Sequence, residues 1–340
     1  MNKKLVLIPA VFSVLSYANN AYARDHIWAV GSSTVYPFVT VVAEEFGKNT
    51  KFKTPVIEST GTGGGFKLFC AGTGDGHPDL SDASRAIKKS EEELCGKNGI
   101  SSITEVKIGY DGIVLANSKK DKRYSLTKKQ IFLALAKKIP SKGKLIENNY
   151  QKWSDIDKSL PNEKIEVYGP PPTSGTRDAF SELVMDSACE EFPEFEKAYS
   201  DKKERGKACQ LLREDGKYIE AGENDNLIVR KLVSNPSTLG IFGYSYLEQN
   251  QSSIQGSIID GVEPTFENIS SGKYKVSRPL FVYVKDAHVS KISGMKEFVK
   301  ELISKGALGE DGYLSNKGLI PLPADEFKKL SSDIRNKLKL

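Results

Sequence analysis

Hydrophobic residues in this chain fall into short extended runs that are followed, three times, by apolar residues at helical spacing. Residues 27–30, 55–58 and 164–168 form the extended runs. Each is followed by small polar residues and then by apolar side chains three or four positions apart, which is typical of an amphipathic helix. The pattern therefore predicts three places where the chain leaves a strand, turns and begins a helix.

These junctions have the chemistry of an anion site. A helix start leaves backbone N–H groups unpaired and carries partial positive charge, and small side chains let an anion approach it. In the junction after residue 168, Ser174 and Thr176 add hydroxyl donors and Arg177 adds a charged fork. An ordinary N-cap followed by a surface arginine would explain one such junction. Three of them favour several helix starts directed at one anion, beyond the carboxyl ends of the strands.

The order of the elements predicts two lobes. Strands and helices alternate as in a mostly parallel α/β sheet, and 340 residues exceed the size at which a single core usually divides. Long strands at 106–116 and 278–285 are candidates for crossing between the lobes, the first with a glycine on each side of Tyr110 and Asp111. Further elements are predicted as helices at 126–136, 227–233 and 292–303, a strand at 240–244, and a polar helix after the extended segment 318–323.

The N-terminus has the form of a secretory signal peptide. Residues 1–4 are basic, residues 5–15 are apolar, and residues 21–23 form a small-x-small cleavage site. The apolar run is too short to span a bilayer, which argues against a membrane anchor. We therefore expect residues 1–23 to be removed and the mature chain to begin near Arg24.

Removal of the two lysines in that segment lowers the formal net charge from +5 to +3 (5 − 2). So mild a charge predicts neither nucleic-acid binding nor attachment to a membrane surface.

Four cysteines in an exported chain predict disulfides. Three pairings are possible. We predict Cys70–Cys95 and Cys189–Cys209, because each pair is local and would fall within one lobe. A zinc site is the alternative, but the chain has no C-x-x-C and its three histidines are scattered.

Five motifs, taken in order, resemble the substrate-binding protein of the high-affinity phosphate ABC transporter. The resemblance covers nearly the whole mature chain. The motifs are Gly31-Ser32-Ser33-Thr34-Val35-Tyr36-Pro37, Gly61-Thr62-Gly63-Gly64-Gly65, Asp82-Ala83-Ser84-Arg85, Gly109-Tyr110-Asp111-Gly112-Ile113-Val114-Leu115-Ala116 and Thr173-Ser174-Gly175-Thr176-Arg177.

The resemblance implies an α/β fold of the two-lobed periplasmic-binding-protein type (type II), with mixed sheets, helices on both faces and a ligand cleft between the lobes. We assign residues 24–114 and 282–340 to lobe 1 and residues 115–281 to lobe 2. The function implied is capture of inorganic phosphate in the periplasm and its delivery to a membrane permease, with no catalysis and no cofactor. We expect a monomer.

The resemblance also implies the phosphate-binding residues, which come from four loops. Many members carry an arginine where this chain has Pro170, so we predict that Arg85 and Arg177 supply the positive charge instead. A buried carboxylate would accept the proton that phosphate keeps and sulfate lacks; we favour Asp111 for this role over Asp82. The other predicted ligands are Ser33, Thr34, Thr62, Ser84, Ser174, Gly175 and Thr176.

Two other classes of function compete with this interpretation. A secreted phosphate-handling hydrolase would require a nucleophile elbow, a phosphate loop or a metal cluster, and the chain has no Gly-x-Ser-x-Gly and no Gly-Lys-Ser/Thr ending. An adhesin or surface interaction protein built on the same fold is compatible with the sequence.

Overall fold

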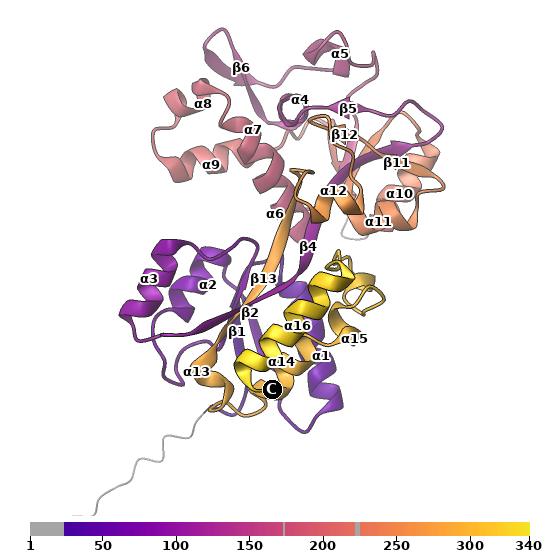
Figure 1. Cartoon of the computed structure of the whole chain (residues 1–340). Coiled ribbons are helices and arrows are strands. Elements are labelled where there is room, and N and C mark those ends of the chain that lie inside the picture. Colours follow the sequence, from indigo (N-terminus) through magenta and orange to yellow (C-terminus); the bar gives the residue numbers. More distant parts are fainter. Residues whose placement is uncertain (1–23, 173, 222–224) are drawn as a thin grey trace, which may run out of the picture.

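Two strands pass between the two lobes and connect them (Figure 1). They are β4 (Ile103–Ser118) and β13 (Ser277–Lys285), which pair antiparallel along their length, as their predicted crossing requires. The structure is a computed structural model that describes residues 24–172, 174–221 and 225–340. The predicted signal peptide, residues 1–23, lies outside the described residues.

One mixed sheet passes through both lobes in the order β2-β1-β3-β13-β4-β10-β8-β9, with β11 also paired to β4. In lobe 1, β1 is parallel to β2 and β3, and β13 is antiparallel to β3. In lobe 2, β10 is antiparallel to β4 and parallel to β8. The strands named here are β1 (Trp28–Gly31), β2 (Val56–Ser59), β3 (Leu80–Ala83), β8 (Val167–Gly169), β9 (Tyr218–Glu220), β10 (Leu239–Gly243) and β11 (Ile254–Gly256).

Helices cover both faces of the lobe 1 sheet, as the fold class predicted. Alternate residues of β13 face opposite sides: Val282 packs in the core with Phe46 and Phe298, while Tyr283 packs in another with Phe66. The helices and turns of this lobe are α1 (Tyr36–Asn49), α2 (Thr62–Phe69), α3 (Lys89–Lys97), α13 (Asp286–Val289), α14 (Met295–Leu302), α15 (Lys305–Leu308), η2 (Ser315–Lys317) and α16 (Ala324–Leu338).

Lobe 2 has its own core, in which Trp153, Phe180 and Phe242 are fully buried. Burying one such side chain stabilises the fold by about 1.5–3 kcal/mol. Its other elements are β5 (Ser125–Leu126), α4 (Lys128–Leu135), β6 (Lys138–Ser141), β7 (Lys144–Glu147), α5 (Trp153–Ile156), α6 (Gly175–Phe180), η1 (Ser181–Asp186), α7 (Ser187–Cys189), α8 (Pro193–Ala198), α9 (Lys202–Gln210), α10 (Asp225–Ser234), α11 (Tyr244–Gln249), β12 (Ile258–Ile259) and α12 (Phe266–Ser270).

The helix predicted at 126–136 is shorter than its apolar pattern suggested. Thr127 caps α4, because its hydroxyl accepts from the Gln130 N–H (3.1 Å) and its own N–H donates to the Gln130 side chain (2.9 Å). Residues before this cap pair as β5 with β12 instead. The capping box fixed the helix start two residues later than the hydrophobic spacing alone predicted.

The close contact between β4 and the C-terminal segment explains one of the two glycines in β4. Gly109 has φ +150°, and a Cβ there would lie 2.5 Å from the Ile320 carbonyl oxygen. The absent side chain lets Tyr110 exchange two backbone hydrogen bonds with Ile320, of 2.8 and 3.0 Å. The extended C-terminal segment is thereby fastened to the crossing strand.

Both predicted disulfides are present. Cys70 at the end of α2 bonds to Cys95 on α3, and Cys189 on α7 bonds to Cys209 on α9. Each lies within one lobe. No helix in the described parts of the chain is long and apolar enough to cross a membrane.

Candidate functional site

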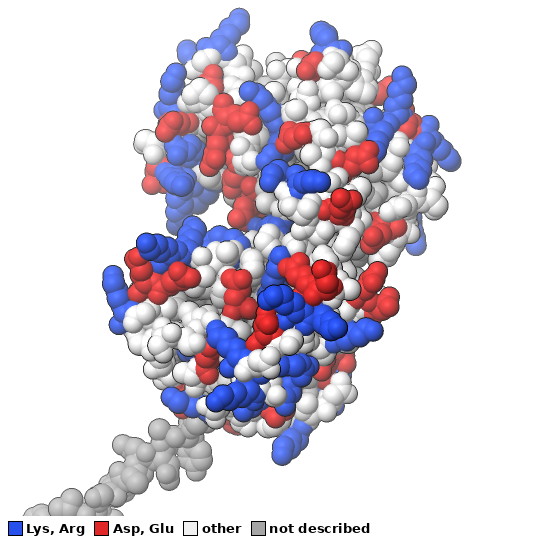
Figure 2. Space-filling model, viewed as in Figure 1, with Lys and Arg blue, Asp and Glu red and all other residues white. Residues whose placement is uncertain are grey.

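A cavity opens where the two lobes face each other, on the side where the outline in Figure 2 is indented. Loops at the ends of β1, β2 and β3 supply one wall, the α6–η1 helix supplies another, and β13 supplies one side chain. Its lining residues are Ser32, Ser33, Thr34, Gly61, Thr62, Gly63, Ser84, Arg85, Asp178, Glu182 and Arg278.

A larger depression lies between α11, α12 and the segment from α15 to α16. Carboxylates of Glu248, Glu310 and Asp311 line it, with Lys305 as the one lysine or arginine among its described lining residues. That charge balance disfavours an anion. The smaller cavity balances the carboxylates of Asp178 and Glu182 with two arginines and adds several hydroxyl donors, so it is the candidate site.

The first junction is built by a glycine. Gly31 ends β1 with φ +145°, and a Cβ there would lie 2.1 Å from the Asp82 carbonyl oxygen on β3. Ser32 then donates its N–H to that oxygen (2.9 Å), and its hydroxyl accepts from the Thr34 N–H (3.2 Å). These bonds hold Ser33 and Thr34, two predicted ligands, at the amino end of α1.

The second junction and the loop after β3 meet at their hydroxyls. The Thr62 hydroxyl lies 3.2 Å from that of Ser84 and accepts from the Ser84 N–H at 3.2 Å. Gly65 allows this, because a Cβ there would lie 2.6 Å from Gly31 Cα and would push α2 away from β1. The structure thus brings four of the predicted ligands, Ser33, Thr34, Thr62 and Ser84, to one cavity.

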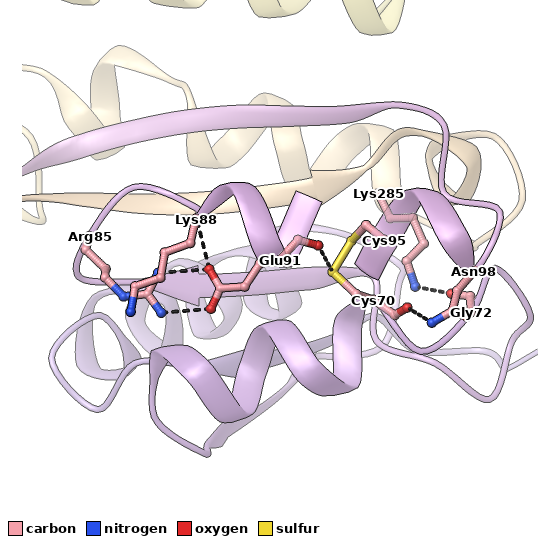
Figure 3. The surroundings of a disulfide bond; sticks show 8 residues. All are labelled: Cys70, Gly72, Arg85, Lys88, Glu91, Cys95, Asn98 and Lys285. Carbon is pink, nitrogen blue, oxygen red and sulfur yellow. Dashed lines mark hydrogen bonds and ion pairs between the residues drawn. A yellow bond between two sulfur atoms is a disulfide. The ribbon is translucent and has the colours of Figure 1, made fainter. Parts of the chain in front are cut away.

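Arg85 lines the cavity, but its charge is already paired. Glu91 accepts two hydrogen bonds from its guanidinium, at 2.8 and 2.9 Å, and also the Lys88 N–H at the start of α3 (Figure 3). The bond to Glu91 raises the pKa of Arg85. Burial opposes ionisation of Glu91, yet its bonds to Arg85 and Lys88 leave its pKa below the ordinary value.

The junction between β8 and α6 faces the first junction from lobe 2. Ser174 caps α6 by accepting from the Thr176 N–H (3.2 Å). A Cβ on Gly175 would lie 3.6 Å from the Ser33 carbonyl oxygen, so the two junctions touch across the cleft. Thr173 lies outside the described residues. Ser174, Gly175 and Thr176 do not themselves line the cavity as it stands.

Arg177 contacts groups of lobe 2 outside the cavity. Its guanidinium donates to the Pro170 carbonyl (3.1 Å) and the Tyr218 hydroxyl (3.0 Å), and it stacks over the Tyr218 ring at 4.8 Å. Glu220 lies 3.8 Å away. These contacts fasten the loop before α6 to β9. The side chain is absent from the cavity wall, so this geometry does not favour the predicted role of Arg177 as an anion partner.

The charge that faces the cavity comes instead from Arg278, which the sequence analysis missed. It lies on β13 directly opposite Asp111 on β4, and its side chain is 7% exposed. One guanidinium nitrogen donates to the Thr34 hydroxyl at 2.8 Å, another pairs with Glu182, and the third lies 3.8 Å from the Asp111 carboxylate. The sequence predicted that the two strands cross, but the register that places Arg278 opposite Asp111 is visible only in the structure.

Two buried carboxylates lie beside these donors. Burial raises the pKa of Asp111, which Arg278 opposes, and one of its oxygens has no hydrogen-bond partner among the described residues. Burial also raises the pKa of Asp82 well above its ordinary range, and neither of its oxygens has a described partner. Asp82 adjoins Gly31 and Ser32 in the sheet register. Both side chains therefore have carboxylate oxygens beside the site that can still accept a hydrogen bond.

Comparisons with known proteins agree with this architecture. The profile of the PBP superfamily domain matches residues 18–305. Protein SphX of Synechococcus elongatus is 31% identical over 99% of this chain and 90% of its own length. The phosphate-binding protein PstS of Staphylococcus epidermidis is 33% identical over 90% of this chain and 82% of its own.

Solved structures show the same fold. A possible phosphate binding protein from Planctomyces limnophilus superposes with a TM-score of 0.73 at 28% identity, over 92% of this chain and 97% of that one. An ABC-type phosphate transport receptor from Vibrio cholerae has a TM-score of 0.59 at 18% identity, over 88% and 100% of the two chains.

Proposed function

Because the chain belongs to the PBP superfamily, and within it to the PstS-like phosphate-binding proteins, we propose that it captures inorganic phosphate between its lobes and delivers it to an ABC-type permease. Named relatives such as the Staphylococcus epidermidis protein are binding proteins, which supports binding rather than catalysis. The signal-peptide pattern supports a periplasmic location.

The observation that carries the proposal is a cavity lined by hydrogen-bond donors, next to which β3 and β4 hold two buried carboxylates with oxygens that have no hydrogen-bond partner among the described residues. The hydroxyls of Ser33, Thr34, Thr62 and Ser84 and the guanidinium of Arg278 can donate to phosphate oxygens. Asp82 and Asp111 can each accept a hydrogen bond. A ligand that fits must both accept several hydrogen bonds and donate at least one.

Monohydrogen phosphate meets both requirements, whereas sulfate meets only the first. A buried carboxylate accepts the P–O–H proton of HPO₄²⁻ and repels SO₄²⁻, which has no proton to give. Arg278 supplies full charge from β13, and Arg85 adds charge at the rim although Glu91 offsets it. Ser174, Gly175 and Thr176 would then close over the anion from lobe 2.

Isothermal titration of protein stripped of phosphate tests this function. Phosphate should bind saturably at one site per chain, and sulfate and molybdate should bind far more weakly or not at all. Equal binding of sulfate would remove the carboxylates from the argument. No heat with any of the three anions would overturn the proposed ligand.

Delivery to a permease and the monomeric state are part of the same proposal. A monomer with one cleft per chain suits a carrier that docks, opens and releases its ligand. Co-purification of the tagged protein with its membrane permease, and light scattering of the free protein, would test these two points.

A further inference from the structure

Two carboxylates from lobe 2 already occupy donors that the proposed ligand needs. The Ser33 hydroxyl, on the first junction of lobe 1, donates to Asp178 at 2.8 Å. Arg278, on β13, pairs with the Glu182 carboxylate. Asp178 and Glu182 are four positions apart on the continuous α6–η1 helix, so they lie one turn apart on one face.

Burial is unequal within the Arg278 pair. The Arg278 side chain is 7% exposed, whereas that of Glu182 is 57% exposed. Asp178 is likewise exposed. A cation held out of water is costly unless an anion compensates it, so Arg278 requires a partner at all times. Glu182 carries no such requirement, because it can turn into solvent and be hydrated there.

Asp111 does not remove the need for that partner. Its carboxylate is 3.8 Å from the Arg278 Nε, too far for a hydrogen bond, and that nitrogen has no hydrogen-bond partner among the described residues. Thr34 is neutral. Glu182 is thus the carboxylate in direct contact with the guanidinium.

We propose that Glu182 and Asp178 are stand-in anions, which hold Arg278 and Ser33 while the site is empty and give way when phosphate enters. The inference rests on the proposed phosphate binding and adds two residues that tune it. Since the carboxylates and phosphate compete for the same donors, the apparent affinity is lower than the site could reach. Because the contact between Ser33 and Asp178 joins lobe 1 to lobe 2, it also draws the lobes together without ligand.

Charge-neutral variants measure the competition. Glu182→Gln and Asp178→Asn keep the shape and hydrogen-bonding ability of each side chain but remove its charge. Glu190→Gln is the matched control, since Glu190 is an exposed acid that follows α7 on the same lobe and does not line the cavity. Phosphate affinity is measured by isothermal titration on stripped protein for each single variant and for the double variant.

We expect Glu182→Gln to bind phosphate about threefold to tenfold more tightly than Glu190→Gln, with a further gain in the double variant. An unchanged or weaker affinity would overturn the inference. A weaker affinity would identify Glu182 as a direct ligand, since a ligand's removal loses contacts instead of freeing donors.

Small-angle scattering of the ligand-free proteins provides a readout independent of phosphate. The double variant should have a larger radius of gyration than wild type, because the uncharged side chain introduced by Asp178→Asn holds the Ser33 hydroxyl across the cleft more weakly, while Glu190→Gln should match wild type. If the wild-type protein does not bind phosphate, the proposed function is wrong, and scattering then tests the contacts by themselves. Equal radii of gyration for wild type and the double variant would show that the two carboxylates do not hold the lobes together.

Discussion

Replacing Arg278 by alanine should weaken phosphate binding by about 30-fold to several thousand-fold. The side chain is 7% exposed and donates to Thr34 at 2.8 Å, so its charge acts on the cavity with little screening by solvent. Loss of a hydrogen-bonded charge partner in such a site costs on the order of 2–5 kcal/mol. At 1.4 kcal/mol for each factor of ten, that cost gives the stated range. Arg278→Lys should restore only part of the lost affinity, because an ammonium group cannot donate the paired hydrogen bonds of a planar guanidinium.

Isothermal titration with phosphate, on variants whose folding is confirmed by circular dichroism, measures this effect. Arg177→Ala is the matched control: its affinity should stay within about threefold of wild type, while its melting temperature falls with the loss of the bonds to Pro170 and Tyr218. An Arg278→Ala affinity within threefold of wild type would refute the assignment of charge. A large loss of phosphate affinity in Arg177→Ala would support the prediction from sequence that Arg177 binds the anion.

Three further predictions concern selectivity and stability. Asp82→Asn and Asp111→Asn should each let sulfate compete better with phosphate in titrations if that acid accepts the phosphate proton. A variant that still rejects sulfate as wild type does would show that its acid does not accept that proton. Replacing both Cys70 and Cys95 by alanine should lower the free energy of unfolding by about 3.5 kcal/mol for a separation of 25 residues, measured by denaturant titration. Burial raises the pKa of Asp186 from 3.8 to about 6, so its contribution favours the folded state below about pH 4 and is lost as pH rises through 6. Asp186→Asn should therefore melt higher than wild type at pH 7.5 and no higher at pH 4.

The junctions could be predicted from sequence because their causes are local. Gly31 and Gly61 permit turns, small polar residues follow, and an apolar stripe then defines each helix. The ends of parallel strands lie at one edge of a sheet, so junctions far apart in sequence were expected to meet. Ser33, Thr62 and Ser84 do line one cavity.

The source of charge could not be found in the same way, because it depends on strand register and on distant partners. Arg278 lies outside every loop motif and reaches the cavity because β13 pairs it with Asp111. Arg177 lies inside a motif, yet Tyr218 on β9 and the Pro170 carbonyl hold it elsewhere. The position of an arginine in the sequence relative to a loop motif therefore did not predict where its guanidinium lies in the structure.

The predicted boundaries show the same limit. The strands that cross were identified from their length, but the sequence placed the changes of lobe after residues 114 and 281. The buried cores divide earlier, between Ile108 and Tyr110 on β4 and between Val276 and Leu280 on β13. Side-chain packing decides this division, and Ile320 from the C-terminal segment also joins the core of lobe 2.

The position of β13 within the sheet has a consequence for how the chain acquires its structure. β13 lies between β3 and β4, and it pairs Phe281 with Ala83, which is 198 residues earlier (281 − 83). Until residue 285 is available, β3 keeps an unpaired edge, and closing so long a loop is slow. We expect lobe 2 to mature first, so that amides of β8 and β10 gain protection before those of β1 and β3 in pulse-labelled hydrogen exchange. A chain that is synthesised from its N-terminus would thus leave lobe 1 incompletely folded until almost the whole chain is available.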